Sequence, residues 1–273
     1  MLATTTVTEP HIASIACCGA YGYLQTSPEY FMKRLLAHGS GDIFHLGKVF
    51  RDEEQGRHHA REFTMLEWYR CQYTLTQLMD ELDAYLAHVF QLPAAQRISY
   101  RDAFETHAGF NPHHINTHKL IDFVNKKTTY SCSTTDNRDT LLDVVMTHLI
   151  APAFAKKTPV IMYDFPASQA GLAKTADMNG DQVAQRFELY WQGVEIANAY
   201  HELQSSTEQL RRFTQDNIIR KRLGLPIMEI DQKLLDALPC LPDCCGIAVG
   251  LDRLLMLSQN LTTLDAVMAF AHG

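Results

Sequence analysis

Charged and aromatic side chains alternate along residues 50–70, FRDEEQGRHHAREFTMLEWYR. This pattern predicts two β-strands joined by a charged loop, with the second strand beginning near Phe63, where aromatic residues gather. Alternate side chains of a strand share a face, so Glu67 and Tyr69 are expected to point the same way as Phe63. A guanidinium such as that of Arg51 is suited to bind phosphate, and an aromatic ring is suited to a flat heterocycle. The stretch indicates nucleotide binding, with a solvated hairpin as the alternative, because runs of charge usually face water.

The same stretch carries a family resemblance. The pattern FRxE at residues 50–53, followed by HxxxFxxxE at residues 59–67, resembles motif 2 of the class II aminoacyl-tRNA synthetases. Residues 246–254, GIAVGLDRL, resemble their motif 3. A closer resemblance is to the elongation factor P β-lysine ligases, an offshoot of the lysyl-tRNA synthetase branch. It is carried by TSPEY at 26–30, FTMLEWYR at 63–70, FPASQ at 165–169 and EIAN at 195–198.

The resemblance covers nearly the whole chain and implies a fold. We expect an α+β protein with a class II aminoacyl-tRNA synthetase-like antiparallel β-sheet flanked by helices. The chain has 273 residues, of which 46% are hydrophobic, enough to bury a sizeable core. We expect one catalytic domain over residues 1–273, with a mostly helical insertion at about 98–158 between the two motifs.

The resemblance also implies adenylate formation, in which a substrate carboxylate attacks the α-phosphate of ATP. Such a site must hold the reactants and neutralise the spreading charge. The residues expected to act in catalysis are Arg51, Glu53 and Arg253. The residues expected at ATP are Arg51, Asp52, Glu53, His59, Phe63, Glu195, Ile196, Gly250 and Arg253. Mg²⁺ prefers a few carboxylates together with phosphates, and Glu195 and Glu202 are the expected ligands.

An amino-acid substrate is implied beside the nucleotide. The residues expected to contact it are Ser27, Pro28, Glu29, Glu67, Tyr69, Asn198, Glu202 and Ala248. Three carboxylates among these suit a diamino acid. The sequence SPE also predicts a helix start, with Ser27 as the N-cap and Pro28 in the first helical position.

Ala248 is expected to read the substrate's amine. The matching residue of lysyl-tRNA synthetases is usually Gly, whereas the β-lysine ligases have Ala. It lies two residues before Gly250, so the two should share a strand face. A methyl group there occupies the space that an α-amino group would need and favours a β-amino acid. The alternative is that Ala248 only packs the sheet.

Strict alternation would place Glu195 and Glu202 on opposite faces of one strand. A β-bulge between them would restore a common face; without one, a single functional carboxylate is the alternative. Glu195 stands between apolar neighbours, so a buried, paired or cation-bound carboxylate is expected there.

Three features depart from the resembled family. Ala60 replaces an Asn that contacts ATP, with Arg61 as a possible compensation, and Ala199 replaces a Gly beside the catalytic strand. Motif 1, which builds the class II dimer, would precede residue 1. The family implies a homodimer, and the missing motif is consistent with a misassigned start, a cut chain or a naturally shortened paralogue.

Charge and composition bear on partners. The formal net charge is −7, whereas a tRNA or DNA binder usually shows a basic face, so no tRNA is expected. The sequence contains no run of eighteen apolar residues and no signal peptide, so no membrane partner is expected. Seven cysteines without a CxxC pair suit reduced thiols and a cytoplasmic location.

The leading hypothesis is an ATP-dependent ligase. It activates (R)-β-lysine or lysine and passes it to a lysine side chain of elongation factor P. The second hypothesis is the core of a lysyl-tRNA synthetase, which also needs an anticodon-binding domain. The third is a catalytically silent paralogue that acts as a binding or regulatory protein. The departures at Ala60 and motif 1 favour the third, and the intact charged residues of both motifs oppose it.

Overall fold

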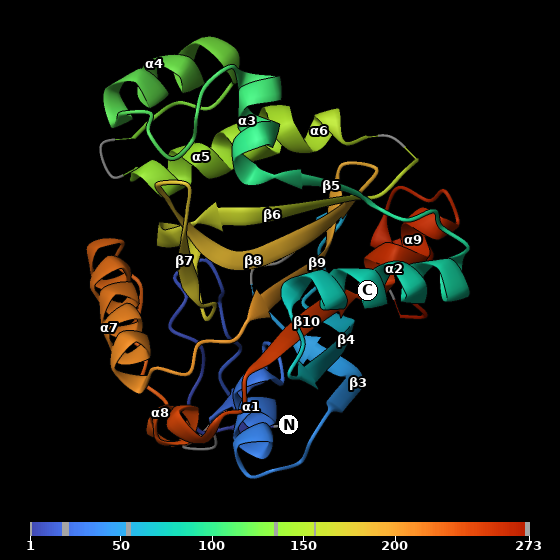
Figure 1. Cartoon of the computed structure of the whole chain (residues 1–273), viewed down its shortest axis with the longest axis vertical. Helices are drawn as coiled ribbons and strands as arrows, with labels where there is room; N and C mark the ends of the chain where they lie inside the picture. Colours follow the sequence, from blue (N-terminus) through green and yellow to red (C-terminus); the bar gives the residue numbers. More distant parts are fainter. Residues whose placement is uncertain (1, 18–21, 53–55, 134–135, 156, 271–273) are drawn as a thin grey trace. The chain divides into compact units, whose positions relative to one another are not determined.

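The computed structural model describes residues 2–17, 22–52, 56–133, 136–155 and 157–270. The chain forms two compact units (Figure 1). The first unit comprises Met1–Thr74 and Glu202–Gly273, and the second comprises Leu75–His201. Both sequence motifs that resemble class II synthetases therefore belong to the first unit.

The first unit combines a small sheet with helices from both ends of the chain. Its elements are β1 (Leu2–Ala3), β2 (Tyr23–Leu24), α1 (Glu29–Ala37), β3 (Ile43–Phe50), β4 (Glu62–Cys71), α7 (Ser206–Arg222), α8 (Gln232–Ala237), the 3₁₀ turn η3 (Leu238–Cys240), β10 (Cys244–Gly250), α9 (Leu251–Ser258) and the 3₁₀ turn η4 (Leu264–Ala266).

Strand β4 is the centre of the first unit's main sheet. It pairs antiparallel with β3 on one side and with β10 on the other. His45 of β3 and Ala248 of β10 both lie directly opposite Glu67, so these three residues share one face. The predicted pair of strands is confirmed: β3 ends at Phe50, and β4 begins one residue before Phe63.

The start of helix α1 is set by Ser27 and Pro28, which directly precede its first residue. Pro28 is the N-cap, and the helix starts at Glu29. The Ser27 hydroxyl accepts a hydrogen bond from the Glu29 backbone N–H at 3.0 Å. The predicted helix is present, but its start is shifted by one residue: Pro28 rather than Ser27 is the N-cap, and Glu29 rather than Pro28 is the first helical residue.

The second unit combines a curved sheet with a group of helices. Its elements are α2 (Leu75–Phe90), β5 (Gln96–Ser99), α3 (Tyr100–Ala108), α4 (Thr117–Lys127), α5 (Arg138–Val145), the π-helical turn η1 (Met146–Ile150), α6 (Ala151–Ala153), β6 (Val160–Pro166), the 3₁₀ turn η2 (Ala167–Gln169), β7 (Thr175–Met178), β8 (Asp181–Trp191) and β9 (Val194–His201).

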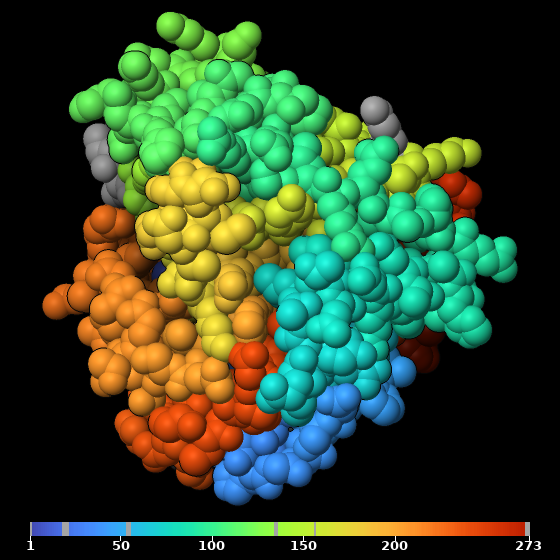
Figure 2. All heavy atoms as spheres, in the orientation of Figure 1, coloured from blue at the N-terminus to red at the C-terminus, as the bar shows by residue number. Residues whose placement is uncertain are grey.

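The strands of the second unit follow the order β9–β8–β6–β5, and β7 also pairs with β8. All of these pairs are antiparallel except β5–β6, which is parallel. Helices α3, α4 and α5 lie on one side of β6 (Figure 1) and bury a core that includes Tyr100, Phe104, Leu120 and Leu141. In the space-filling view the green residues of this helical segment form one continuous surface (Figure 2). The predicted α+β class is confirmed by antiparallel sheets with helices packed beside them.

Strand β8 is more buried than its sequence suggests. Alternation of Phe187, Leu189 and Trp191 with polar residues predicts a half-buried strand. In the structure Glu188 and Tyr190, on the opposite face, are buried as well. That face carries an ion-paired polar cluster, described below, so its polar residues do not face water.

No helix within the described part of the chain is long and apolar enough to cross a membrane.

Candidate active site

A buried carboxylate stands at the centre of the first unit's sheet. Glu67 is 2% exposed, and the Tyr69 hydroxyl donates to its Oε1 at 2.6 Å. Its other oxygen, Oε2, has no hydrogen-bond partner among the described residues. Burial raises the pKa of Glu67, and with the charges of Glu29 and Glu202 the value reaches about 8. The predicted common face of Glu67 and Tyr69 is confirmed by their hydrogen bond.

Two more predicted substrate carboxylates lie near Glu67 and share one cation. Lys33 of α1 places its Nζ 2.6 Å from Glu29 Oε1 and 2.6 Å from Glu202 Oε2. The side chains of Lys33 and Glu202 are each 1% exposed, and that of Glu29 is 18% exposed. The carboxylates raise the pKa of Lys33 above its ordinary value, although burial alone would lower it. Sequence reasoning missed Lys33; its signal was the i, i+4 spacing from Glu29 on a helix.

A glycine at position 246 lets the side chains of Tyr69 and Glu202 pack closely against strand β10. Gly246 of β10 lies directly opposite Tyr69, and a Cβ added there would come within 2.5 Å of Glu202 Oε1. Any side chain at this position would displace Tyr69 or Glu202. Ala248, two residues along, lies opposite Glu67 and is half-buried. The structure thus places Ala248 on the same sheet face as the buried carboxylate.

Two of the residues of motif 2 that are predicted to bind the nucleotide, Arg51 and Phe63, lie next to each other. Arg51 directly follows β3, and its guanidinium lies over the Phe63 ring, 5.2 Å from the ring centroid. Its Nε donates to the backbone oxygen of Thr26 at 3.4 Å. Asp52 forms an ion pair with Arg61 at 3.5 Å. Glu53, predicted to act in catalysis, lies outside the described residues.

The loop of motif 2 is tied to motif 3. Gly56 and His59 exchange backbone hydrogen bonds of 3.1 and 3.2 Å in a tight turn. Arg253 Nε donates to the backbone oxygen of His58 at 2.9 Å, and Asp252 accepts from the Thr64 N–H at 2.5 Å. Burial lowers the pKa of His58, and the charge of Arg253 lowers it further. The Arg253 side chain is therefore positioned beside the loop that follows Arg51.

Gly250 ends β10 and is the N-cap of α9, which places the helix N-terminus next to the sheet.

Ala60 is buried, at 2% exposure, whereas Arg61 is exposed. A larger Asn at position 60 would need room that this chain does not provide there. Arg61 reaches Asp52 instead.

The second unit holds a separate buried cluster around Arg186. Its Nε donates to Asn198 Oδ1 and its NH1 donates to the Gln169 backbone oxygen, both at 2.9 Å. The guanidinium also contacts Glu188 and lies 4.6 Å from the ring centroid of Phe165. Asn198, a predicted substrate residue, is thus held by Arg186, a residue that sequence reasoning missed.

Glu188 is the second residue that sequence reasoning missed. It accepts hydrogen bonds from Arg186 and from the Tyr190 hydroxyl. Burial raises its pKa to about 7; Arg186 lowers the value and the charge of Glu195 raises it. The electrostatic effect of Glu195 indicates that both carboxylates lie near each other on one sheet face.

A β-bulge brings Glu195 onto that face. Glu195 lies opposite Tyr190, and Ala197 lies opposite Leu189, so Ile196 is the extra residue of β9. Asn198 lies opposite Glu188, on the same side as Glu195. Of the two alternatives that the spacing left open, the structure therefore has the bulge. One expectation is corrected, because Glu195 is exposed rather than buried. Ile196, the extra residue, is buried.

Metal ligation is compatible with a limited set of residues. Among the described residues no group of three or more His, Cys, Asp or Glu side chains is arranged to hold a metal ion. Both oxygens of Glu188 already accept hydrogen bonds from Arg186 and Tyr190, so Glu195, which is exposed, is the carboxylate better placed to meet Mg²⁺. This ion keeps several waters and takes further ligands from phosphates. Glu202 already has the Lys33 ammonium 2.6 Å from one oxygen, so its environment suits a cationic amine better than a metal.

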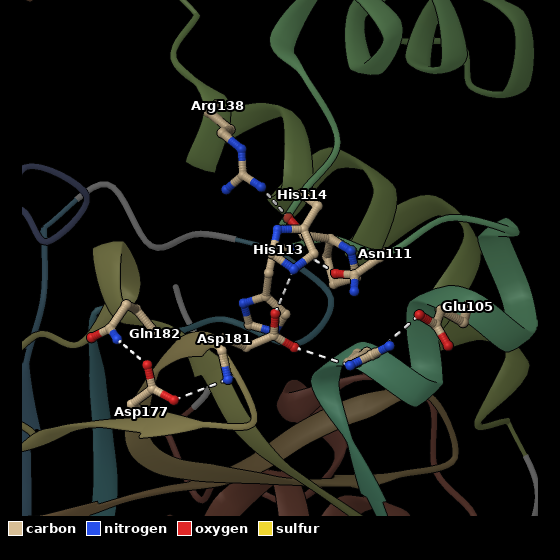
Figure 3. A network of polar contacts seen from close by, with 11 residues as sticks. Glu105, Asn111, His113, His114, Arg138, Asp177, Asp181 and Gln182 are labelled. Atoms are coloured by element: carbon tan, nitrogen blue, oxygen red, sulfur yellow. Dashed lines mark hydrogen bonds and ion pairs between the residues drawn. The ribbon is translucent and has the colours of Figure 1, made fainter.

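A third polar network lies at the helical side of the second unit (Figure 3). His114 Nε2 lies 2.8 Å from Asp181 Oδ1, and Arg101 lies 3.4 Å from Asp181 Oδ2. Arg101 also binds Glu105 at 3.0 Å. Asp181 begins β8, so the network joins this strand to α3 and to the loop before α4. It ties elements together and contains none of the predicted site residues.

In the first unit, the antiparallel sheet, the Arg51–Phe63 pair and the buried carboxylates agree with an enzyme of the class II synthetase type. The chain belongs to the class II tRNA synthetase family (D, K and N), whose model matches residues 4–273. Among curated relatives, it is similar to an elongation factor P–(R)-β-lysine ligase of Yersinia enterocolitica, with 43% identity over 282 residues. That match covers 100% of this chain and 86% of the relative.

A protein of Salmonella gallinarum with the same name is 47% identical over 250 residues, covering 91% of this chain and 77% of the relative. The resemblance inferred from the sequence motifs is confirmed by these matches. The role of each site residue remains a prediction.

Proposed function

We propose that this protein is an ATP-dependent ligase that activates (R)-β-lysine as an adenylate and transfers it to a lysine side chain of elongation factor P. The main observation in favour of a diamino acid as the substrate is the state of Glu67. Glu67 is buried with an oxygen that lacks a partner, beside Glu29 and Glu202. A buried carboxylate in this state is costly unless it meets a cation, and a diamino acid supplies two ammonium groups.

In the first proposed step, a carboxylate oxygen of the amino acid attacks the α-phosphorus of ATP. A new O–P bond forms, the bond to the β-phosphate oxygen breaks, and pyrophosphate leaves. Arg51 neutralises charge at the α-phosphate, which requires it to leave or share its position over Phe63. Arg253 serves the outer phosphates. Mg²⁺ would supply charge neutralisation at the phosphates when bound, and Glu195 is the carboxylate proposed to hold it.

In the second proposed step, the amine of the acceptor lysine attacks the carbonyl carbon of the adenylate. An amide bond forms, the carbon–oxygen bond to phosphate breaks, AMP leaves, and the amine loses a proton to solvent. The mixed anhydride is reactive enough that no protein nucleophile is needed. The protein contributes position and a held substrate amine.

Substrate choice is assigned to the face shared by Glu67 and Ala248. The Ala248 methyl limits space near an α-amino group and leaves room for an amine one carbon further along. The acceptor is a translation factor, so we expect the reaction to occur in the cytoplasm, without tRNA. We expect a homodimer by analogy with the class II synthetases.

Intact-mass spectrometry tests the function directly. The protein is incubated with elongation factor P, ATP, Mg²⁺ and either (R)-β-lysine or lysine. We expect elongation factor P to gain the mass of one lysyl unit, faster with (R)-β-lysine, and no gain without ATP. A matched reaction replaces elongation factor P by tRNA specific for lysine. Charging of the tRNA, with no change in elongation factor P, would contradict the proposal and support a lysyl-tRNA synthetase.

A further inference from the structure

Lys33 is a buried cation between carboxylates that are proposed to receive the ammonium groups of the substrate. Its side chain is 1% exposed, and its Nζ lies 2.6 Å from one oxygen of Glu29 and 2.6 Å from one oxygen of Glu202. Lysine is almost never buried to this extent unless it is paired. A buried ion pair often contributes little net stability, because desolvation of both charges is expensive. The position of Lys33 therefore suggests a role besides holding the fold.

The lysine ties together groups from distant parts of the chain. Glu29 and Lys33 are one helical turn apart on α1, and Glu202 follows β9 in the sequence. The Glu202 backbone N–H donates to the Cys244 oxygen of β10 at 3.0 Å, which fixes the start of its side chain. Lys33 fixes the far end. The buried residues of α8 and η3, which pack against α1, are the apolar Leu234, Leu235, Ala237 and Leu238.

The charge balance of the pocket follows from these contacts. Three carboxylates, those of Glu29, Glu67 and Glu202, surround one ammonium group, that of Lys33. With every group ionised, the pocket carries two negative charges in excess. A substrate with two ammonium groups balances this excess, and a substrate with one does not.

We propose that Lys33 is a positioning residue that orients Glu29 and Glu202 and sets the charge of the pocket, so that a substrate with two ammonium groups is selected over one with a single ammonium group. The inference rests on the proposed function and extends it from the identity of the substrate to the way in which its charge is recognised. The carboxylates that Lys33 orients, together with Glu67 Oε2, receive the substrate. Lys33 itself does not touch the reacting atoms.

A merely structural lysine would have a different signature. It would stabilise α1 against the sheet, and its loss would affect all amino-acid substrates equally. If Lys33 orients the carboxylates, its loss should raise KM more for a substrate with two ammonium groups than for a substrate with one. The two roles are therefore separated by the ratio of KM values for two substrates that differ in one amine.

The test uses Lys33→Met, which keeps the length of the side chain and removes its charge. Lys48→Met is the control, because Lys48 is an exposed lysine of the same unit, 3.7 Å from Glu62. ATP–pyrophosphate exchange is measured with (R)-3,6-diaminohexanoic acid, which is (R)-β-lysine, and with 3-aminohexanoic acid, which lacks the second amine. A charge-assisted hydrogen bond contributes roughly 10- to 100-fold in affinity. We expect KM for the diamino acid to rise by about that factor in Lys33→Met, with kcat changed less than about threefold.

The monoamine should respond less, because it uses fewer of the oriented carboxylates. We expect its KM to rise by no more than about threefold, which narrows the ratio between the two substrates, and we expect Lys48→Met to behave like the native protein. Equal changes for both substrates, or a fall in kcat at constant KM, would overturn the proposal.

A second variant, Lys33→Ala, supplies a positive readout. It leaves a cavity in which n-propylammonium fits the place of the missing methylenes and ammonium group, and 1-propanol fills the same space without charge. We expect n-propylammonium, and not 1-propanol, to restore the KM for the diamino acid. Equal rescue by both compounds would show that only packing was lost. If neither Lys33 variant folds, Lys33 serves the fold and the proposal fails.

Failure of this inference is distinguishable from failure of the proposed function. If the native protein gives no pyrophosphate exchange with either acid, the ligase assignment fails. Calorimetric binding of the two acids to native protein and Lys33→Met then still reports on Lys33, because it requires no catalysis. Loss of the preference for the diamino acid in the variant supports the role of Lys33, and an unchanged preference contradicts it.

Discussion

Each unit of the protein contains a cation held among polar groups, Lys33 buried and Arg186 half-buried. The two clusters differ in how many of their polar groups have partners. In the second unit, Arg186 donates to Asn198, to a backbone oxygen and to Glu188, and it packs on the Phe165 ring. In the first unit, Lys33 is outnumbered by carboxylates, and Glu67 Oε2 has no partner among the described residues. A satisfied cluster fixes strands in register, whereas an unsatisfied one reserves a place for a ligand.

The largest expected effect lies in the satisfied cluster. Arg186→Met removes a half-buried charge and leaves Glu188 without its cation, so the free energy of unfolding should fall by about 3–5 kcal/mol. Urea denaturation measures this value. Arg211→Met is the control, since Arg211 is 67% exposed beside Glu208 and an exposed pair is worth about 0–1 kcal/mol. A loss below about 1 kcal/mol for Arg186→Met would show that the cluster does not hold the sheet.

The next effect concerns the nucleotide end of the first unit. Arg51→Ala should leave the fold intact and abolish most of the ATP–pyrophosphate exchange, because loss of one such contact costs about 2.7–4 kcal/mol in the transition state. Arg70→Ala is the control, since the Arg70 side chain is 36% exposed and pairs with Asp42 at 3.1 Å. Exchange near the native rate in a folded Arg51→Ala protein would contradict the role given to Arg51.

A smaller effect tests the shape of the pocket. Ala248→Gly removes one methyl beside Glu67, and a change of this size is worth about 1–3 kcal/mol of discrimination. We expect the ratio of kcat/KM for (R)-β-lysine over lysine to fall or reverse. The ratio is measured by pyrophosphate exchange in both proteins. The same ratio in both would mean that Ala248 only packs the sheet.

The smallest effect concerns the one hydrogen bond that Glu67 has. Tyr69→Phe removes the donor to Glu67 Oε1, and a bond of this kind contributes about 0.5–1.5 kcal/mol to stability. This bond lowers the pKa of Glu67, so its loss should raise that pKa further. Thermal unfolding gives the first quantity, and the pH dependence of substrate affinity gives the second. If substrate affinity in Tyr69→Phe depended on pH as in the native protein, Tyr69 would have no effect on the ionisation of Glu67.

Much of the first unit was predictable from local patterns. Alternation in a strand fixes which side chains share a face, so Glu67, Tyr69 and Ala248 were assigned to one surface without a structure. In the second unit, the spacing of Glu195 and Glu202 left a β-bulge as one of two alternatives, and the structure has a bulge at Ile196.

The cations of both clusters were not predictable in this way. Lys33 lies on an amphipathic helix, and the sequence does not show that its face meets carboxylates from β4 and from residue 202. Arg186 and Glu188 alternate with apolar residues, a pattern that normally indicates a solvated face. Their burial depends on Phe165 and Gln169, which come from a different segment of the chain. Long-range packing of this kind leaves no local signal.

Proton release on substrate binding tests the central claim most directly, because it reports on Glu67 itself. Glu67 has a pKa of about 8 in the free protein and is therefore mainly neutral at pH 7. An ammonium group beside it favours the ionised form, so binding should release a proton, and affinity should increase as pH rises from 6 to 8. Titration calorimetry with (R)-β-lysine at pH 7, in two buffers of different ionisation enthalpy, measures this release. We expect close to one proton released by the native protein and none by Glu67→Gln; tight binding without proton release in the native protein would contradict the account.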